Sequence, residues 1–367
     1  MGTLNPFRYR TINRILPFGF IWFFTGSVFM LSDYFATGNK ALERGAITLN
    51  IETFAFASSA VFIVGLVVGY LETVVVDPRL RNKSFIATIV WKFLIYNVFF
   101  VMMMAVLYPI AAALEMNVSL WDIQVKQRFA EFWQSNALYG TSIQLVFSLL
   151  VTVLYAEIRD NLGAAVLYNF FTGKYHKPIT EERIFMFVDM KASTTIAEQL
   201  GHVRYFTFLQ RYYNDMADAI IAHWGEVYQY IGDEVVISWP VKKGIRNTDC
   251  IACFYSLQRA IQKQASKYKE QFDVVPQFKA GMHMGKVTTG ELGALKKELV
   301  FTGDVVNTTA RIQSLCNEMK TELLISDQLK QALQPNHKYK FDVKGTIALR
   351  GKEETIKLYA VEEQNKE

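Results

Sequence analysis

Four long apolar segments in the first part of the chain constrain its fold more than any other feature. A helix needs about 20 mostly apolar residues to cross a bilayer, and each segment is near or above that length. The first has no A-x-A-like cleavage site and further spans follow it, so we do not interpret it as a cleaved signal peptide. We predict a four-helix transmembrane bundle over residues 1–155, with spans near residues 15–31, 54–75, 85–112 and 137–155.

Basic residues near the ends of these segments predict the orientation of the bundle. They precede the first span or lie in the short loop between the second and third: Arg8, Arg10, Arg14, Arg79, Arg81 and Lys83. Basic loops stay on the cytoplasmic side, so both termini and the C-terminal half are expected there. We therefore predict a multi-pass protein of the cell (inner) membrane that contacts the lipid bilayer.

Beyond residue 155 the composition is that of an ordinary globular domain, preceded by a helical linker at residues 156–182. The net charge of +5 is mild, and no basic stripe with interleaved aromatics is present, so we expect no nucleic-acid partner. Cys250, Cys253 and Cys316 are too few for a disulfide framework, and free thiols fit a cytoplasmic location. Cys250 and Cys253 lie in a helical run without a second pair, which indicates core packing.

Strand-like and helix-like segments alternate after residue 182 without strict βαβ repetition, which predicts an α+β sheet covered by helices. The stretch "RIFMFVDMKAST" reads as a buried strand that ends at Asp189, and the turn after it, with Ser193 and Thr194, offers amide donors to an anion. In "VYQYIGDEVVISW" two β-runs meet at a turn that contains Asp233. If these strands are neighbours, the two carboxylates converge at one rim, which suits divalent cations.

A helix is predicted from "TGDVVNTTARIQ", with Asp304 as its N-cap. Asn307 and Arg311 are four residues apart and therefore share one face of this helix. Asn307 could orient a sugar, and Arg311 could neutralise charge that develops in a reaction. Taken singly these features have simpler explanations, because Asp is common in turns and such polar pairs usually form a solvated helix face.

The order of the motifs resembles that of the class III nucleotidyl (adenylate/guanylate) cyclase catalytic domain, over residues 183–363. Four motifs carry the resemblance: "FVDMKAST", "YIGDEVVISW", "AGMHMGKVTTGELG" and "FTGDVVNTTARIQ". It implies an α+β domain with a ferredoxin-like, palm-like antiparallel sheet covered by helices. It also implies a membrane-bound adenylate cyclase that converts ATP to 3′,5′-cyclic AMP and pyrophosphate, since bacterial members mostly use ATP.

The resemblance further implies a role for each motif residue. Asp189 and Asp233 would hold two Mg²⁺ or Mn²⁺ ions, with the Met190 carbonyl as an extra ligand. Asn307 would orient the ribose, and Arg311 would stabilise the transition state as the 3′-hydroxyl attacks the α-phosphate. In this family the metal pair and the Asn/Arg pair come from different subunits, so a homodimer with its active sites at the subunit interface is expected. The terminal phosphates would be contacted by Arg350 or Lys352.

The base-reading positions depart from the family pattern. Adenylate-specific members usually carry Lys four residues before the second metal Asp, and Asp or Thr three residues before the Gly that precedes the later helix. Guanylate-specific members carry Glu and Cys there, whereas this chain has Gln229 and Val300. A Gln amide both donates and accepts hydrogen bonds, so Gln229 could still read a purine edge, with help from Thr302.

Three alternatives stand beside an adenylate cyclase. The first is a guanylate or mixed-purine cyclase. The second is a catalytically silent membrane sensor that uses the cyclase fold for dimerisation, against which count the intact residues Asp189, Asp233, Asn307 and Arg311. The third is a diguanylate cyclase, which would need a GG-D/E-EF turn that "IGDEVV" resembles only superficially.

Overall fold

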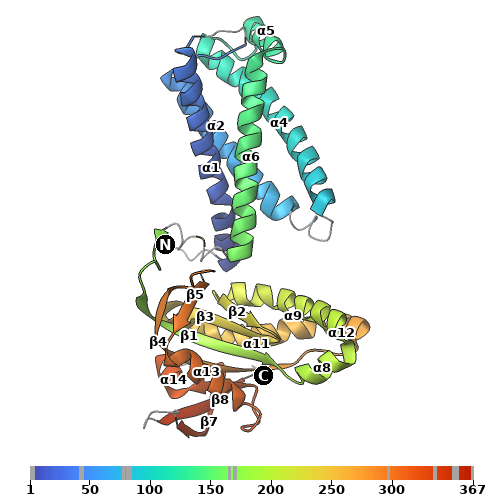
Figure 1. Cartoon of the computed structure of the whole chain (residues 1–367), viewed down its shortest axis with the longest axis vertical. Helices are drawn as coiled ribbons and strands as arrows, with labels where there is room; N and C mark the ends of the chain where they lie inside the picture. The colour runs from blue at the N-terminus through green and yellow to red at the C-terminus, as the bar shows by residue number, and fades with distance from the viewer. Residues whose placement is uncertain are drawn as a thin grey trace. The chain divides into compact units, whose positions relative to one another are not determined.

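The computed structural model describes residues 5–40, 45–76, 79, 85–163, 167, 172–295, 298–333, 337–348 and 355–364. The chain divides into two compact units, of which one comprises Arg8–Leu167 and the other mainly Tyr168–Glu367 (Figure 1). This division falls within the stretch predicted to be a linker. The first unit is helical, and the second contains a sheet with helices on both faces.

Four long helices form the first unit: α1 (Pro6–Thr37), α2 (Ile51–Tyr70), α4 (Phe85–Met116) and α6 (Asn136–Leu162). A π-helical turn, η1 (Leu71–Val76), extends α2. All four helices are long and apolar enough to cross a membrane, which confirms the predicted four-span bundle. The short helix α5 (Ile123–Phe132), which lies between α4 and α6, was not predicted.

Small residues and buried hydroxyls hold these helices together. A Cβ added at Gly65 of α2 would lie 2.7 Å from the Cβ of Trp22 in α1, so only glycine permits this close approach. Between α1 and α6, the hydroxyls of Thr25 and Ser148 are 2.7 Å apart, and the Trp22 indole donates to the Thr152 hydroxyl at 3.3 Å. Packing and interhelical hydrogen bonds therefore replace the hydrophobic effect, which does not drive helix association in lipid.

A buried carboxylate lies where η1 packs beside α4. Glu72 is only 2% exposed, and it accepts hydrogen bonds from the Lys92 ammonium and the Tyr96 hydroxyl. A charge in an apolar interior is strongly unfavourable unless it is paired and hydrogen-bonded. The contacts of Glu72 satisfy this requirement, so we interpret the cluster as a structural element of the bundle.

The second unit is built on an eight-stranded sheet with the order β2-β3-β1-β4-β6-β8-β7, in which β5 pairs with β4. The strands β4 and β6 run parallel, and all other pairs are antiparallel. The predicted α+β class with a mainly antiparallel sheet is confirmed. The strands are β1 (Ile179–Met190), β2 (Glu226–Ile231), β3 (Glu234–Pro240), β4 (Phe278–Leu292), β5 (Glu298–Thr302), β6 (Leu323–Ser326), β7 (Tyr339–Ala348) and β8 (Thr355–Glu363).

The central strand β1 is buried on both faces, because successive side chains point to opposite sides of a sheet. Ile184 and Met186 pack on one side, in a core that also holds the buried cysteines Cys250 and Cys253. This side carries the helices α8 (Ser193–Leu200), α9 (His202–Ala222), α10 (Val241–Gly244), α11 (Asp249–Lys263), α12 (Ala265–Phe272) and α14 (Asp327–Ala332), with the 3₁₀ turn η2 (Arg246–Thr248). Phe185 packs on the other side against α13 (Asp304–Ser314).

Two glycines in β4 let α13 lie directly against the sheet. A Cβ added at Gly281 would lie 2.3 Å from the backbone nitrogen of Gln313, and one at Gly285 would lie 2.5 Å from a methyl of Val305. Carbon atoms do not approach other heavy atoms so closely without displacement, so any larger residue would push α13 outward. The rotation and depth of α13 therefore depend on this strand.

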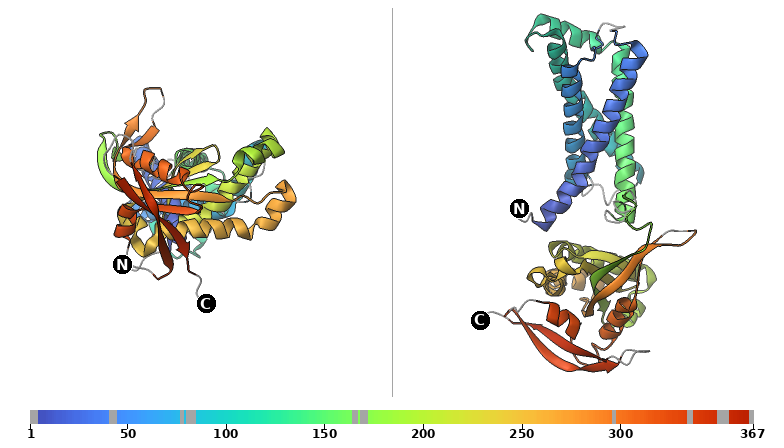
Figure 2. Two further views of the ribbon diagram at one scale, coloured as in Figure 1. Left: turned by 90° about the horizontal axis from the view of Figure 1, so that it is seen from below. Right: turned by 90° about the vertical axis from the view of Figure 1, so that its left-hand side faces the viewer.

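The β4–β5 hairpin extends beyond the rest of the sheet, as both views in Figure 2 show. The strand β4 has 15 residues, and its last part pairs only with β5 after β1 has ended its pairing at Thr289. Leu292 and Leu295 at this end are exposed. The hairpin carries Val300 and Thr302, two of the predicted base-reading residues. They flank Phe301, which packs with Val305 of α13, so their side chains point to the opposite side of the strand.

Gly281→Val should destabilise the second unit by about 2–3 kcal/mol, because the new side chain overlaps the backbone of α13. Pulse proteolysis of the full-length protein in urea measures this loss. Gly290→Ala in the same strand is the control, since its added Cβ would stay 3.4 Å from the nearest atom. Equal losses in the two variants would contradict the proposed tight contact.

Candidate active site

Asp189 lies near the end of β1, at the rim of the sheet. The preceding residue, Val188, pairs with Val235 of β3, and Asp189 itself lies opposite Lys279 of β4. The Asp189 side chain is 28% exposed. A carboxylate at this position can reach solvent and ligand while its strand remains fixed in the core.

Asp233 lies in the turn between β2 and β3. The preceding Gly232 has a φ of +63°, a conformation that glycine adopts without a steric cost. The Tyr213 hydroxyl of α9 donates to the Gly232 carbonyl at 2.7 Å, which fixes the turn against the helix layer. Because β3 lies beside β1, this turn presents Asp233 at the same rim as Asp189, as predicted from the two motifs.

Carboxyl groups crowd this rim, and burial and neighbouring charge raise the pKa of two of them, Asp189 and Glu234. Burial raises the pKa of Asp189, and the charge of Asp233 adds to the shift. The Lys279 ammonium, 3.4 Å from Asp189, and the Gln313 amide, which donates to it at 3.1 Å, act in the opposite direction. Burial together with both aspartates raises the pKa of Glu234 to about 7. The rim is therefore a place of concentrated negative charge.

The donor set at this rim fits divalent cations. One carboxylate oxygen of Asp233 is buried and has no hydrogen-bond partner in the parts of the chain that the structure describes. Carboxylate oxygens are the ligands that Mg²⁺ and Mn²⁺ prefer. Among the described residues no group of three or more His, Cys, Asp and Glu side chains is arranged to hold a metal. Further ligands would have to come from a backbone carbonyl such as that of Met190, from solvent or from substrate phosphates.

The turn after β1 places backbone amides beside Asp189. Met190 ends the strand with its side chain buried, and Ala192 reverses the chain with a φ of 55°. The helix α8 then begins at Ser193 and Thr194, with its first amides free of intrahelical bonds. Burial and the charges of Asp233 and Asp189 raise the pKa of Tyr205 in α9, near this turn. An anion close to the carboxylate rim could bind at this helix start.

The helix α13 points Asn307 and Arg311 away from the carboxylates. At 3.6 residues per turn, Arg311 lies about 200° around the helix from Gln313, and Asn307 about 240°. Gln313 is buried and reaches Asp189, whereas Asn307 is exposed and Arg311 is partly exposed. Within one chain, the structure brings Asp189 and Asp233 together and sets Asn307 and Arg311 together on another side of α13.

The predicted base-reading residues lie on two strands, β2 and β5, that are not paired with each other. Gln229 is exposed in β2, and Val300 and Thr302 belong to β5. The rings of Tyr228 in β2 and Phe301 in β5 contact each other with centroids 4.8 Å apart, which connects the two strands. Gln229 directly follows Tyr228, and Val300 and Thr302 flank Phe301, so all three residues are sequence neighbours of this ring contact.

Sequence reasoning missed three residues at the carboxylate rim. Lys279 contacts Asp189 because the two lie opposite each other on paired strands, which only the strand register could have predicted. Gln313 is two residues beyond Arg311 and so faces the other way, and Glu234 directly follows Asp233. Arg350 and Lys352, the predicted phosphate contacts, lie outside the described residues.

Comparisons with known proteins decide the family. Residues 176–363 match the model of the adenylate and guanylate cyclase catalytic domain. The chain belongs to this family. The resemblance inferred from the four motifs is thereby confirmed, and residues 176–363 are called the cyclase domain below.

Curated relatives and solved structures were also found. Adenylate cyclase 2 of Rhizobium meliloti (strain 1021) is 32% identical over 205 residues, which are 55% of this chain and 56% of that protein. The adenylate cyclase of Anabaena cylindrica is 25% identical over 189 residues, or 50% of this chain and 37% of that protein. A bacterial light-regulated adenylyl cyclase structure matches 60% of this chain and 64% of its own, with 24% identity and a TM-score of 0.49. The chain thus spans little more than half of the first relative and less of the second.

In EDTA, the cyclase domain should lose stability as the pH rises through the ionisation of Glu234. The folded state raises the pKa of Glu234 from 4.5 to about 7, so its contribution to stability is full below about pH 4.5 and lost above about pH 7. Glu234→Gln should therefore be more stable than the unchanged protein at about pH 8, by roughly 1 kcal/mol once solvent screening is allowed for.

The same comparison at about pH 4.5 should show a much smaller difference, because Glu234 is then largely protonated in the folded state. Urea unfolding at the two pH values measures both differences. The exposed carboxylate Glu198 of α8 provides the control, as Glu198→Gln. A stabilisation by Glu234→Gln that does not change with pH would contradict the crowding of carboxyl groups.

Proposed function

We propose that this protein is a membrane-bound adenylate cyclase. It converts ATP to 3′,5′-cyclic AMP and pyrophosphate at two equivalent sites, each shared between the subunits of a homodimer. The observation that carries the proposal is the convergence of Asp189 and Asp233 at one rim of a cyclase domain. Membership of the family supports cyclase chemistry, and the choice of ATP and the shared site are the finer parts of the proposal.

Each residue of the site has a role in this reaction. Asp189 and Asp233 hold two Mg²⁺ or Mn²⁺ ions, which when bound neutralise the triphosphate and favour ionisation of the ribose hydroxyl. The amides that begin α8 at Ser193 face the phosphates. Asn307 orients the ribose, and Arg311 compensates the charge that develops at the α-phosphate. The 3′-oxygen forms the new bond to phosphorus as pyrophosphate leaves, so no covalent protein nucleophile is required.

A homodimer unites the two halves of the site. In one chain, Gln313 extends towards Asp189 while Asn307 and Arg311 extend from another side of the same helix. A two-fold axis would place the Asn/Arg pair of each subunit opposite the carboxylate pair of the other. The four spans favour this pairing, because they confine two copies to one plane and so raise their effective concentration.

ATP is supported as the substrate by the relatives, which are named adenylate cyclases. Gln229 and Thr302 are the polar side chains at the base-reading positions, and Val300 is apolar. Since an amide can pair with the edge of either purine, Gln229 is also compatible with GTP. A guanylate or mixed-purine cyclase is therefore the second candidate.

We further infer that the cyclase domain and both chain termini lie in the cytoplasm, with the spans in the cell's inner membrane. The basic residues in the first turns of α1 and those that follow η1 support this orientation. The three cysteines are free and buried, as is usual for a cytoplasmic domain. ATP is available on that side of the membrane.

Full-length protein supplied with Mn²⁺ should produce cyclic AMP from ATP and should turn over ATP at least about tenfold faster than GTP. Chromatography of the products measures both rates. Faster turnover of GTP would support the second candidate instead. No turnover of either nucleotide would contradict the enzyme and favour the silent sensor.

Asp233→Ala and Arg311→Ala should each lower turnover by about 100-fold or more, since each removes one half of every site. Equal co-expression of the two variants should restore about a quarter of the original rate, because half of the dimers then contain one intact site. Turnover by the unseparated mixture measures the recovery, and mixed dimers purified through two different tags should reach about half of the original rate, because each contains one intact site of two. As a control, Asp233→Ala combined with Asp189→Ala should restore nothing. Failure of the first pair to recover would rule out the shared site.

A further inference from the structure

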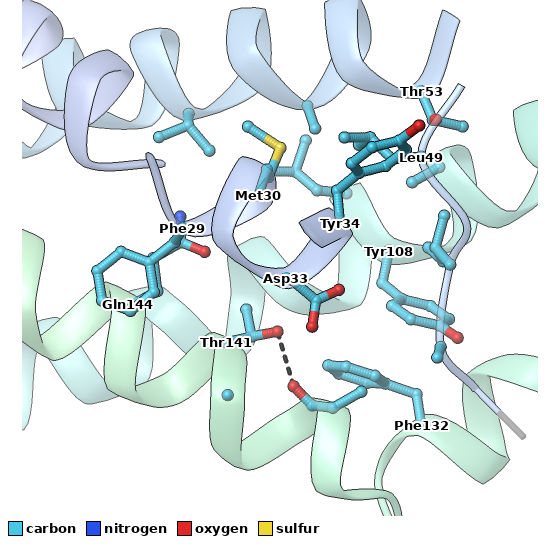
Figure 3. Close-up of a pocket in the computed structure, with 18 of the residues that line it drawn as sticks. Phe29, Met30, Asp33, Tyr34, Leu49, Thr53, Tyr108, Phe132, Thr141 and Gln144 are labelled. Carbon is cyan, nitrogen blue, oxygen red and sulfur yellow. Dashed lines mark hydrogen bonds between the residues drawn. The ribbon is translucent and has the colours of Figure 1, made fainter. Parts of the chain in front are cut away.

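The transmembrane unit contains a cavity that the cyclase reaction does not use. It has a volume of about 670 Å³ and lies among α1, α2, α4 and α6 (Figure 3). It occupies the half of the bundle that holds the end of α1 and the start of α6. Small-molecule sites in proteins have volumes of about 300–1,000 Å³ and mostly apolar walls. The walls here include Phe29, Met30, Leu49, Phe56, Leu107 and Phe132.

Small side chains create this space. The walls contain alanines from α2, α4 and α6, together with Gly140 of α6. A Cβ added at Gly140 would meet no atom within 4 Å. Elsewhere in the same bundle the helices touch closely, as at Gly65, where an added Cβ would overlap Trp22. Protein interiors are normally close-packed, so a void of this size is suited to an occupant.

One carboxylate faces into the cavity. Of the described residues that line it, Asp33 and Lys40 carry a charge. Figure 3 shows the Asp33 carboxylate pointing from α1 towards Thr141 and Phe132. The backbone carbonyl of Asp33 accepts a bond from Thr37, but its carboxylate forms no hydrogen bond or ion pair within the residues that the structure describes. A carboxylate among apolar walls gains most from a positive or hydrogen-bond-donating partner.

Within the described chain the walls do not already supply that partner. Lys40, their one positive charge, is exposed and forms no ion pair with Asp33, and several other side-chain donors bond to backbone carbonyls. These bonds run from Thr141 to Ala137 at 2.8 Å, from Tyr108 to Gly45 at 2.5 Å and from Asn39 to Leu49 at 3.0 Å. The strongest acceptor in the cavity is therefore the Asp33 carboxylate. A ligand that matches these walls would contribute a positive charge at one end and an apolar body along the rest.

We propose that this cavity binds a single-chain cationic amphiphile, with a protonated amine against Asp33 and an apolar chain that extends towards Trp22. Both residues line the cavity. They lie eleven residues apart on α1, which is about 16 Å along the helix axis. An alkyl chain of ordinary lipid length covers this distance. The site shares no residue with the carboxylate rim or with α13, so it does not depend on the proposed function.

Photolabelling of the full-length protein in phosphatidylcholine nanodiscs tests the site. The probe is dodecylamine with a diazirine in its chain, and peptide mapping identifies the labelled residues. We expect saturable labelling of residues that line the cavity, on α1, α2, α4 or α6. Unlabelled dodecylamine should displace the probe, whereas dodecanol and dodecanoate should compete at least about tenfold more weakly, because neither pairs with a carboxylate.

Two matched pairs of variants test separately the role of the Asp33 charge and the role of the cavity volume. Asp33→Asn should weaken binding by about tenfold or more, whereas Glu52→Gln, an exposed carboxylate of α2 outside the cavity, should not. Gly140→Phe should block labelling by filling the cavity, whereas Ala105→Phe, at an exposed position of α4 outside it, should not. Size-exclusion chromatography and circular dichroism of each variant serve as the check that the protein is folded.

The proposal is overturned by three results. The first is labelling that does not saturate or that falls mainly on exposed faces of the helices outside the cavity. The second is equal displacement by the amine, the alcohol and the fatty acid. The third is unchanged binding in folded Asp33→Asn or in folded Gly140→Phe.

Discussion

The contact between α13 and β4 is the constraint on which the cyclase domain depends. Gly281 and Gly285 leave no side chain between the helix and the strand, so the helix can rest on the sheet in one rotation. That rotation turns Gln313 towards Asp189 and leaves Asn307 and Arg311 on another side. A larger residue in β4 would hold the helix away from the sheet. The contact of Gln313 with Asp189 and the placement of Asn307 and Arg311 would then be lost together, because all three side chains belong to one rigid helix.

The carboxylate rim is unfavourable for the folded domain without cations. Asp189 and Glu234 lie in partly buried positions where burial and the charge of Asp233 favour their protonated forms. Lys279 and Gln313 offset part of this repulsion from the neighbouring strand and from α13. Active sites often sacrifice stability in this way, because groups that would stabilise the empty fold would also compete with the ligand.

Much of this architecture could be predicted from the sequence, and the exceptions have physical reasons. The four spans follow from length and hydropathy, because the bilayer imposes both. Asp189 and Asp233 could be predicted to meet because each ends a β-run with a recognisable turn. The contact between Lys279 and Asp189 could not be predicted, since it depends on the register of β1 against β4. The cavity could not be predicted either, because a gap between packed helices produces no periodic pattern in the sequence.

Two carboxylates of the membrane unit show how the cavity differs from the structural core of the bundle. Glu72 is 2% exposed and is bonded to Lys92 and Tyr96, so its charge is neutralised inside the protein. Asp33 lies in a cavity wall, and in the described chain its carboxylate has no such bonds. Unlike the buried Glu72, Asp33 is exposed, so its carboxylate stays accessible to a positively charged group that enters the cavity. The difference is explained if the partner of Asp33 comes from outside the chain.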